Sequence, residues 1–387
     1  MSGASVAVIG GGVIGASVAY HLAQRGWRDV VVLDRGPAPG TGSTGRATGG
    51  FRAQYASAVN VRLSLLAREK LRRFEAETGM DPGYVACGYL WLAGSADELA
   101  ELERAQRTQH DEGLTEAVML GPSDVAAVNP AVSTSGVVGA AYCPTDGFIR
   151  PLSILEGYVR AARRLGVEFR WGVEVAGLRR RPDGRVSAVE TGQGPLEVDA
   201  VVDAAGAWAA AVAAWAGVVL PVEPLRRQAA TTTPCDLLPG TMPMTIWAGD
   251  GFHLRVRDGR VLILQPTPGV PDAPFDARVD PEWVDMVERA AHARVPVLRR
   301  ATIDRAECWA GLYEMSPDKH AILGPPPECP NLFFANGSSG HGVMHAPALG
   351  QLLAEIISDA KASSMDATPL RYGRFAEGDL QPTSGVL

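Results

Sequence analysis

The feature that most restricts the fold is a glycine pattern, Gly10-x-Gly12-x-x-Gly15, near the N-terminus. The preceding Ser5–Ile9 run is apolar, which is typical of a buried parallel strand. Val13–Gly26 then has helical spacing and closes on a glycine. Gly10 permits a sharp turn, Gly12 lets the backbone approach a pyrophosphate, and Gly15 lets helix and strand pack closely. The pattern predicts a loop in which a helix N-terminus faces phosphate.

A second short strand, Asp29–Leu33, completes a βαβ unit and ends at Asp34. A carboxylate in this place accepts hydrogen bonds from ribose hydroxyls and disfavours NADP, whose 2′-phosphate it would repel. The alternative is a purely structural glycine turn, but strand, helix and acidic residue all stand in register. These residues predict a dinucleotide site and leave NAD and FAD open.

The 387 residues are enough for two domains. Strand patterns at Val198–Ala204 and Asn331–Ala335 extend the parallel sheet, and the second is followed by a glycine-rich loop, 337–342, and a helix predicted over Pro347–Asp359. Alternating strands Gly251–Val256 and Arg260–Gln265, joined by Asp258-Gly259, predict a hairpin of an antiparallel sheet.

Composition excludes several classes of partner. The net charge is −7 and no long basic run occurs, so nucleic acid is excluded. Five scattered cysteines without a CxxC spacing argue against a disulfide framework and against a metal site. The longest apolar run, Ala204–Leu220, falls short of the ~20 residues of a membrane span. Because no basic segment precedes Val6, we expect a cytoplasmic protein without a membrane span.

Four further segments carry a family resemblance. Gly42–Arg52 resembles the flavin loop of the D-amino-acid oxidase superfamily. Val202–Trp208 resembles that family's "NAAGAW" strand end, Gly311–Asp318 its "GLYxMTPD" stretch, and Asn336–Met344 its closing "GxSGHGF" loop. The chain is most similar to sarcosine oxidases, to the β subunit of heterotetrameric sarcosine oxidase and to proline dehydrogenase subunits. The resemblance resolves the cofactor in favour of FAD.

The resemblance implies an α/β fold, in which a Rossmann-like FAD-binding domain with a parallel sheet is joined to an α+β substrate domain with an antiparallel sheet. We expect the FAD-binding domain to comprise residues 1–80, 145–221 and 301–387, and the substrate-binding domain residues 81–144 and 222–300. The residues expected to bind FAD are Gly10, Gly12, Val13, Ile14, Gly15, Asp34, Arg35, Ser43, Thr44, Arg46, Ala47, Thr48, Gly49, Gly50, Val175, Ala205, Gly206, Trp208, Gly311, Gly340, His341, Gly342, Val343 and Met344.

Five residues are expected on the substrate side. Arg52 aligns with the family arginine that holds the substrate carboxylate, and the alternative is a structural salt bridge. His253 and Arg255 share one face of a strand because they are two residues apart, and the alternative is a solvent-facing pair. Tyr313 and His341 complete the set, although a lone histidine in a glycine loop is often only a packing residue.

Three positions depart from the pattern of monomeric sarcosine oxidases. Gly311 stands where those enzymes attach flavin to a cysteine, so the resemblance implies non-covalent FAD. Ile263 and Met344 stand where they place two lysines near the flavin. Because a nearby cation stabilises superoxide, uncharged residues there favour a dehydrogenase over a fast oxidase.

The sequence therefore predicts an FAD-dependent oxidoreductase that oxidises the C–N bond of an amine or amino acid, secondary or cyclic, to an imine by hydride transfer to flavin N5. No Asp or Glu stands out as a general base in these segments. The expected partners are a small amine or amino acid and an electron acceptor, which is O₂ or another subunit. The alternative is an FAD-binding subunit or assembly factor with little activity of its own.

Overall fold

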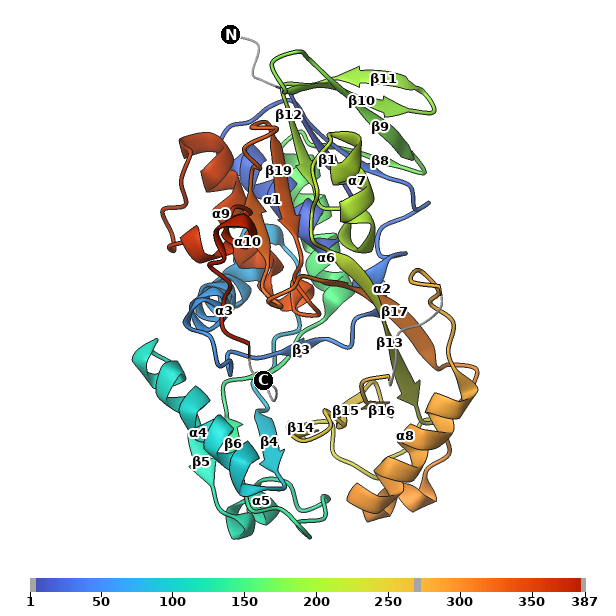
Figure 1. Ribbon diagram of the computed structural model, residues 1–387. Coiled ribbons are helices and arrows are strands. Elements are labelled where there is room, and N and C mark those ends of the chain that lie inside the picture. Colours follow the sequence, from blue (N-terminus) through green and yellow to red (C-terminus); the bar gives the residue numbers. More distant parts are fainter. Residues whose placement is uncertain (1–4, 268–272, 384–387) are drawn as a thin grey trace.

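A computed structural model describes residues 5–267 and 273–383. Figure 1 shows two layers of structure, a parallel sheet wrapped by helices and a larger sheet below it. In the described residues, the first sheet has the order β18-β19-β12-β1-β2-β8. These strands are β18 (Ile322–Gly324), β19 (Leu332–Asn336), β12 (Ala200–Asp203), β1 (Val6–Ile9), β2 (Val30–Asp34) and β8 (Glu168–Trp171). All neighbours pair in parallel except β18, which runs antiparallel to β19.

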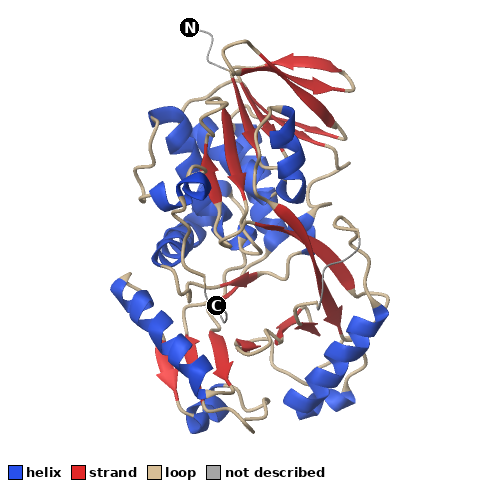
Figure 2. Ribbon diagram, viewed as in Figure 1, coloured by secondary structure: helices blue, strands red, loops and turns tan. Residues whose placement is uncertain are grey.

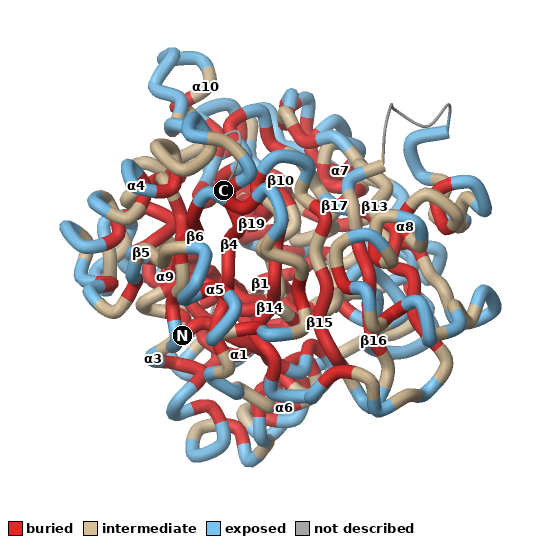
Figure 3. Tube along the Cα trace, turned by 90° about the horizontal axis from the view of Figure 1, so that it is seen from below, coloured by how far each residue is buried: buried red, intermediate tan, exposed pale blue. Residues whose placement is uncertain are grey.

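The alternation of side chains along β1 builds two cores, one on each face of this sheet. Val6 and Val8 pack with α1 (Val13–Gln24), α3 (Ala58–Thr78), α6 (Pro151–Arg164) and α9 (Gly342–Asp359). Ala7 and Ile9 pack on the other face, with α7 (Ala209–Trp215) and a small sheet of β9 (Val175–Arg180), β10 (Val186–Thr191) and β11 (Gly194–Glu197). Figure 3 shows β1 and β19 buried at the centre of the molecule. A continuous apolar strand such as this one is stable only when both faces are covered.

The larger sheet has the order β17-β13-β16-β15-β14-β4-β6-β5 in the described residues. Its strands are β17 (Trp309–Met315), β13 (Glu223–Thr231), β16 (Arg260–Leu264), β15 (His253–Arg257), β14 (Met244–Trp247), β4 (Tyr89–Ala93), β6 (Gly139–Cys143) and β5 (Val118–Leu120). Its pairs are antiparallel except β14 with β4. Figure 2 shows α8 (Pro281–Arg294) beside one end of the sheet, and α4 (Ala96–Asp111) and α5 (Pro122–Val128) beside the other. A short pair, β3 (Gly50–Phe51) with β7 (Gly147–Phe148), lies between the two sheets.

The predicted fold class is confirmed: a parallel α/β sheet and a mainly antiparallel sheet occur in one chain. The hairpin at Asp258-Gly259 is confirmed, with φ of 51° and 72° as its tight turn requires. The last helix was expected to begin at Pro347, which is wrong. It begins at Gly342 and contains Pro347 in its interior. Its buried face packs along α1 and α3, which offsets the backbone hydrogen bond that proline cannot donate. The expected domain boundary at residue 301 placed β17 in the FAD-binding domain. In the structure β17 pairs along β13 in the larger sheet.

Within the helices that the structure describes, none combines the length and apolar character needed to cross a bilayer. In the same residues, no cluster of histidine, cysteine, aspartate and glutamate side chains has the arrangement of a metal site.

Candidate active site

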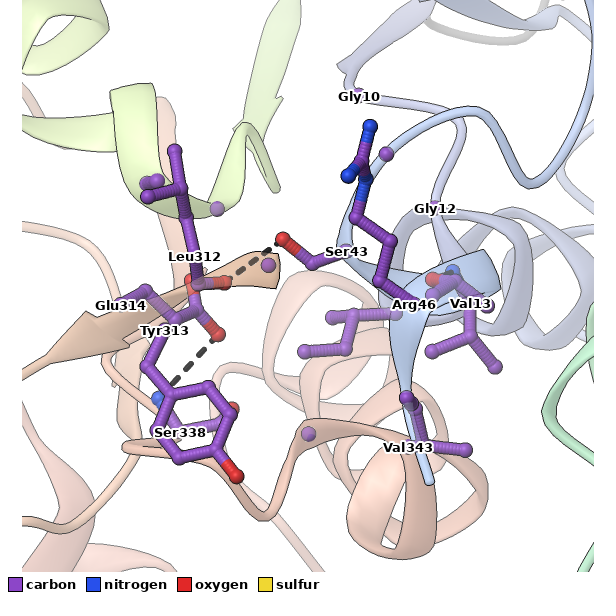
Figure 4. Close-up of a pocket in the computed structure, with 18 of the residues that line it drawn as sticks. Gly10, Gly12, Val13, Ser43, Arg46, Leu312, Tyr313, Glu314, Ser338 and Val343 are labelled. Carbon is purple, nitrogen blue, oxygen red and sulfur yellow. Dashed lines mark hydrogen bonds between the residues drawn. The ribbon is translucent and has the colours of Figure 1, made fainter. Parts of the chain in front are cut away.

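A cavity of about 1190 Å³ opens between the two sheets. Its walls are the carboxyl ends of β1, β2 and β12, the segment before β3, the strands β13, β15 and β17, and the loop before α9. Figure 4 shows residues of these distant segments around one space. The volume exceeds the range of roughly 300–1,000 Å³ of drug-sized ligand sites, so a dinucleotide and a small substrate fit together.

The glycine loop is shaped by backbone packing. A Cβ on Gly10 would lie 2.3 Å from the carbonyl oxygen of Ala204, and one on Gly15 would lie 1.9 Å from that of Gly10. Only glycine therefore fits at these two positions. At Gly12 the nearest atom is Thr44 Oγ1 at 3.4 Å, so the loop stays open on its cavity side. α1 starts after Gly12, which has no side chain to cap it, and the helix N-terminus faces the cavity.

Asp34 is held at the end of β2 by two backbone bonds. Its Oδ2 accepts from Gly11 N–H and its Oδ1 from Gly36 N–H, both at 2.7 Å. The carboxylate still lines the cavity and keeps lone pairs for ribose hydroxyls. Beside it, the Arg35 guanidinium lies 3.9 Å from the centre of the Trp208 ring. These residues form a wall suited to the nucleoside half of a dinucleotide.

The segment before β3 joins the glycine loop to β17. Thr44 Oγ1 accepts from Val13 N–H at 3.1 Å, and Ser43 Oγ donates to the carbonyl of Leu312 at 2.8 Å. Arg46 Nη1 donates to the carbonyl of Ala310 at 2.6 Å. Figure 4 shows Ser43 bonded to Leu312 across the cavity. The short helix α2 (Ser43–Arg46) thus brings β17 against the cofactor end of the site.

The residues present fit FAD. Every position expected to bind FAD lines the cavity except Gly15, which packs the helix on the strand. Two buried oxygens at the cavity wall, Ser338 Oγ and Glu314 Oε2, have no hydrogen-bond partner among the described residues. A bound group with polar edges, such as the flavin ring, would provide hydrogen-bond partners for these two oxygens.

Arg52 follows β3 and is buried in the cavity wall. Nη1 donates to the carbonyl of Gln54 at 3.1 Å, and Nη2 lies 3.2 Å from Nε2 of His341. The guanidinium also lies 4.2 Å from the centre of the Tyr55 ring and 4.9 Å from that of Trp91. No carboxylate lies within ion-pair distance of it in the described part of the chain. Its charge is therefore available for an anionic ligand.

Both cavity histidines are neutral. Burial, followed by the charge of Arg52, holds the pKa of His341 well below its usual value. Burial also lowers the pKa of His253, whose Nδ1 lies 2.8 Å from the carbonyl of Gly251. Nδ1 of His253 therefore carries the proton, and Nε2 is left as an acceptor.

Tyr313 lines the cavity from β17, as expected. Its ring occupies the space beside Gly340, where a Cβ would lie 2.3 Å from Cε2. Gly340 also has a φ of 95°, so this loop position requires glycine on two grounds.

Arg255 shares the expected face with His253, since Leu254 and Val256 point into the opposite core. It does not line the cavity, however. Its Nη1 donates to the carbonyls of Thr48 and Gly49, both at 2.8 Å, and the guanidinium lies 3.5 Å from the centre of the Phe148 ring. Burial lowers its pKa to about 10. Arg255 therefore holds the segment before β3 in place without lining the cavity.

Ile263, expected near the flavin, does not line the cavity. Ile263 points into the core of the antiparallel sheet, and Leu264 lines the cavity instead. Met344 does line the cavity, as expected. Both cavity-facing residues are uncharged, and the described lining contains no lysine.

Two charged lining residues of the larger sheet were not expected from the sequence. Glu314 lies on β17, where burial raises its pKa to about 7, and its Oε1 accepts from Ser338 N–H at 3.2 Å. No carboxylate was expected at the site from the sequence, although Glu314 stands in the Gly311–Asp318 segment that carries the family resemblance. Arg227 lies on β13 and also lines the cavity. The sequence did not indicate that Arg227 faces the cavity, because a single charged residue in a strand is usually exposed to solvent.

The comparisons with known proteins agree with this geometry. The chain is 30% identical to glycine oxidase of Geobacillus kaustophilus over 383 residues, which cover 95% of this chain and 96% of that protein. It is 29% identical to bovine FAD-dependent oxidoreductase domain-containing protein 1, with 97% and 85% covered. The crystal structure of L-proline dehydrogenase from P. horikoshii superposes with a TM-score of 0.90 at 28% identity, covering 98% of this chain and 99% of that one.

The family described as FAD-dependent oxidoreductase, DAO, matches residues 5–356, well over half of the chain. The protein therefore belongs to the DAO family of FAD-dependent oxidoreductases, and FAD is its cofactor.

Proposed function

We propose that this protein oxidises the C–N bond of a small amino acid with a secondary or cyclic amine. The observation that carries the proposal is the guanidinium of Arg52, buried in the cavity wall without a carboxylate partner. A guanidinium fork suits a carboxylate, and the desolvated setting strengthens that interaction. Glycine oxidase and L-proline dehydrogenase, by their names, act on amino acids, which supports the same class.

The proposed reaction is a two-electron oxidation of the C–N bond of the substrate. A C–H bond next to nitrogen breaks, nitrogen loses a proton, and a C=N bond forms. When bound, FAD would supply the acceptor for the hydrogen and its electron pair, and O₂ or a partner's acceptor group would be the final electron acceptor. Water then adds to the imine and releases the amine and a carbonyl compound.

The chain's own side chains position and desolvate the substrate. Arg52 holds the carboxylate, and His341 and the Tyr55 and Trp91 rings fix the plane of the guanidinium. Neutral His253 and His341 do not repel an ammonium group as charged rings would. Glu314, with a pKa of about 7, is a candidate to accept the proton that leaves nitrogen.

The test is anaerobic reduction of the purified holoprotein with sarcosine, L-proline and glycine. We expect the blue absorption band of the flavin to bleach with at least one of them, and Arg52→Lys to raise the concentration required. The surface variant Arg150→Lys serves as control, because that arginine pairs with Asp258 at the exterior. A band that no amine bleaches would refute the proposal and favour an FAD-binding subunit or assembly factor.

A further inference from the structure

We propose that the cavity selects a substrate with two carboxylates, one bound by Arg52 and the other by Arg227, on either side of the reacting amine. This inference rests on the proposed function and narrows its substrate class. It starts from the placement of Arg227, which the oxidation of a simple amino acid leaves without a role.

Arg227 reaches the cavity because of the register of β13 with β17. It stands directly opposite Gly311, and residues opposite each other in an antiparallel pair share a face. Two residues further along, Ala229 faces Trp309 on the same side, and both line the cavity. Gly311 contributes no side chain, and the aliphatic part of Arg46 packs against it, so no acidic side chain of β17 stands directly opposite Arg227.

Arg227 has no acidic partner in the described residues. Within the described residues, its Nη1 donates to the carbonyl of Arg226 at 3.5 Å, and its guanidinium carbon lies 5.8 Å from the centre of the Tyr313 ring. Burial lowers its pKa. A partly buried guanidinium with so few acceptors is stabilised by an anion that enters from the cavity.

Arg52 and Arg227 come from different parts of the fold, but both line the same cavity. Arg52 follows β3, whereas Arg227 lies on the far sheet. Both charges act to lower the pKa of His253 and of Tyr313, and both of these residues line the cavity. Two cations at one small site match two anionic groups on one ligand better than a single carboxylate.

The other charges of the lining do not neutralise Arg227. Asp34 is bonded to Gly11 and Gly36 at the nucleoside end. Glu174 is exposed, and the half-buried Glu314 accepts a hydrogen bond from Ser338 N–H. The helix N-terminus at the glycine loop is the expected partner of the FAD phosphates, so they are paired there and not with Arg227.

A binding experiment tests the inference without turnover. Thioethers cannot form an imine, so (methylthio)acetate and thiodiacetate, with longer-armed thioether diacids, are titrated into the oxidised holoprotein while the flavin spectrum is followed. We expect at least one diacid to bind about tenfold or more tightly than the monoacid, as a charge-assisted bond predicts. Arg227→Met should remove that difference.

The matched control is Arg226→Met. Arg226 is the neighbouring residue on β13, does not line the cavity, and donates to the carbonyl of Arg278. It should keep the preference for diacids. Equal affinities for monoacid and diacids in the wild type, or a preference that survives Arg227→Met, would overturn the inference.

A second experiment, which measures flavin reduction by substrates, distinguishes failure of this inference from failure of the proposed function. Sarcosine and iminodiacetate differ by one carboxylate, and we expect iminodiacetate to reduce the flavin at a lower concentration in an Arg227-dependent manner. If neither amine reduces the flavin but the diacids bind through Arg227, the proposed oxidation fails and the two-carboxylate site stands. If sarcosine reduces the flavin as readily as iminodiacetate, only the two-carboxylate site fails.

Discussion

Nη2 of Arg52 donates to Nε2 of His341 across 3.2 Å, and this bond joins the residue after β3 to the loop before α9. The direction is fixed, because a guanidinium has no acceptor and the neutral imidazole offers one nitrogen lone pair. The carboxylate-binding group expected from the sequence is thus positioned by a second residue of the same site.

The first prediction concerns this bond. His341→Phe keeps an aromatic ring beside Tyr55 but removes the acceptor. We expect KM for an amino acid substrate, and the dissociation constant of a carboxylate inhibitor, to rise about three- to tenfold, with a smaller change in kcat. Steady-state kinetics measure this split, with His292→Phe on α8 as control. A loss confined to kcat would contradict a positioning role.

Arg255→Met should weaken FAD binding more than substrate binding. The substitution removes two charge-assisted bonds to the carbonyls of Thr48 and Gly49. We expect the dissociation constant of FAD, measured by quenching of flavin fluorescence, to rise about tenfold or more. Unchanged FAD affinity would show that the segment before β3 holds its shape without this support.

FAD should leave the protein on denaturation. Gly311 provides no sulfur for a covalent bond, and even a Cβ there would lie 3.1 Å from Cβ of Arg46. Precipitation with acid should therefore leave the yellow flavin in the supernatant. Flavin retained in the washed pellet would refute non-covalent binding.

Gly15→Ala and Gly12→Ala should have different effects on stability. The new Cβ at position 15 would lie 1.9 Å from the Gly10 carbonyl oxygen, so the backbone must shift and Tm should fall. At position 12 the nearest atom is 3.4 Å away, so the FAD-free protein should keep its Tm. Gly12→Ala should still weaken FAD binding, because the methyl group occupies the path of the pyrophosphate. Equal losses of Tm in both FAD-free variants would contradict this reading.

The buried carboxyl group of Asp203 should make stability depend on pH. Burial raises its pKa to about 8, above the ordinary value of 3.8. The folded state therefore holds a proton that the unfolded state has lost, and stability decreases as pH rises from about 4 to about 8. Asp203→Asn should flatten Tm between about pH 4 and pH 8. A Tm profile identical to that of the wild type would contradict this assignment.

The elements that the sequence predicted well depend on local spacing. The βαβ unit, the hairpin at Asp258 and the glycine-rich loops each follow from residues close together in the chain. The expected start of the last helix at Pro347 was wrong, because packing on α1 and α3 holds proline inside a helix. The expected position of Ile263 near the flavin was wrong, because neighbouring residues of a strand point to opposite faces and Leu264 takes the face toward the cavity.

The sequence by itself determined the nucleotide loop and the acidic residue at its edge, because Gly10, Gly15 and Asp34 act through backbone geometry within one short unit. The choice of FAD over NAD came from the family resemblance of segments such as Gly42–Arg52. Only the tertiary structure decided which charges reach the reacting space. The pairing of β13 with β17 brings Arg227 to the cavity, and two backbone carbonyls hold Arg255 outside it. Strand registers and desolvation arise between segments far apart in the chain, and no local pattern encodes them.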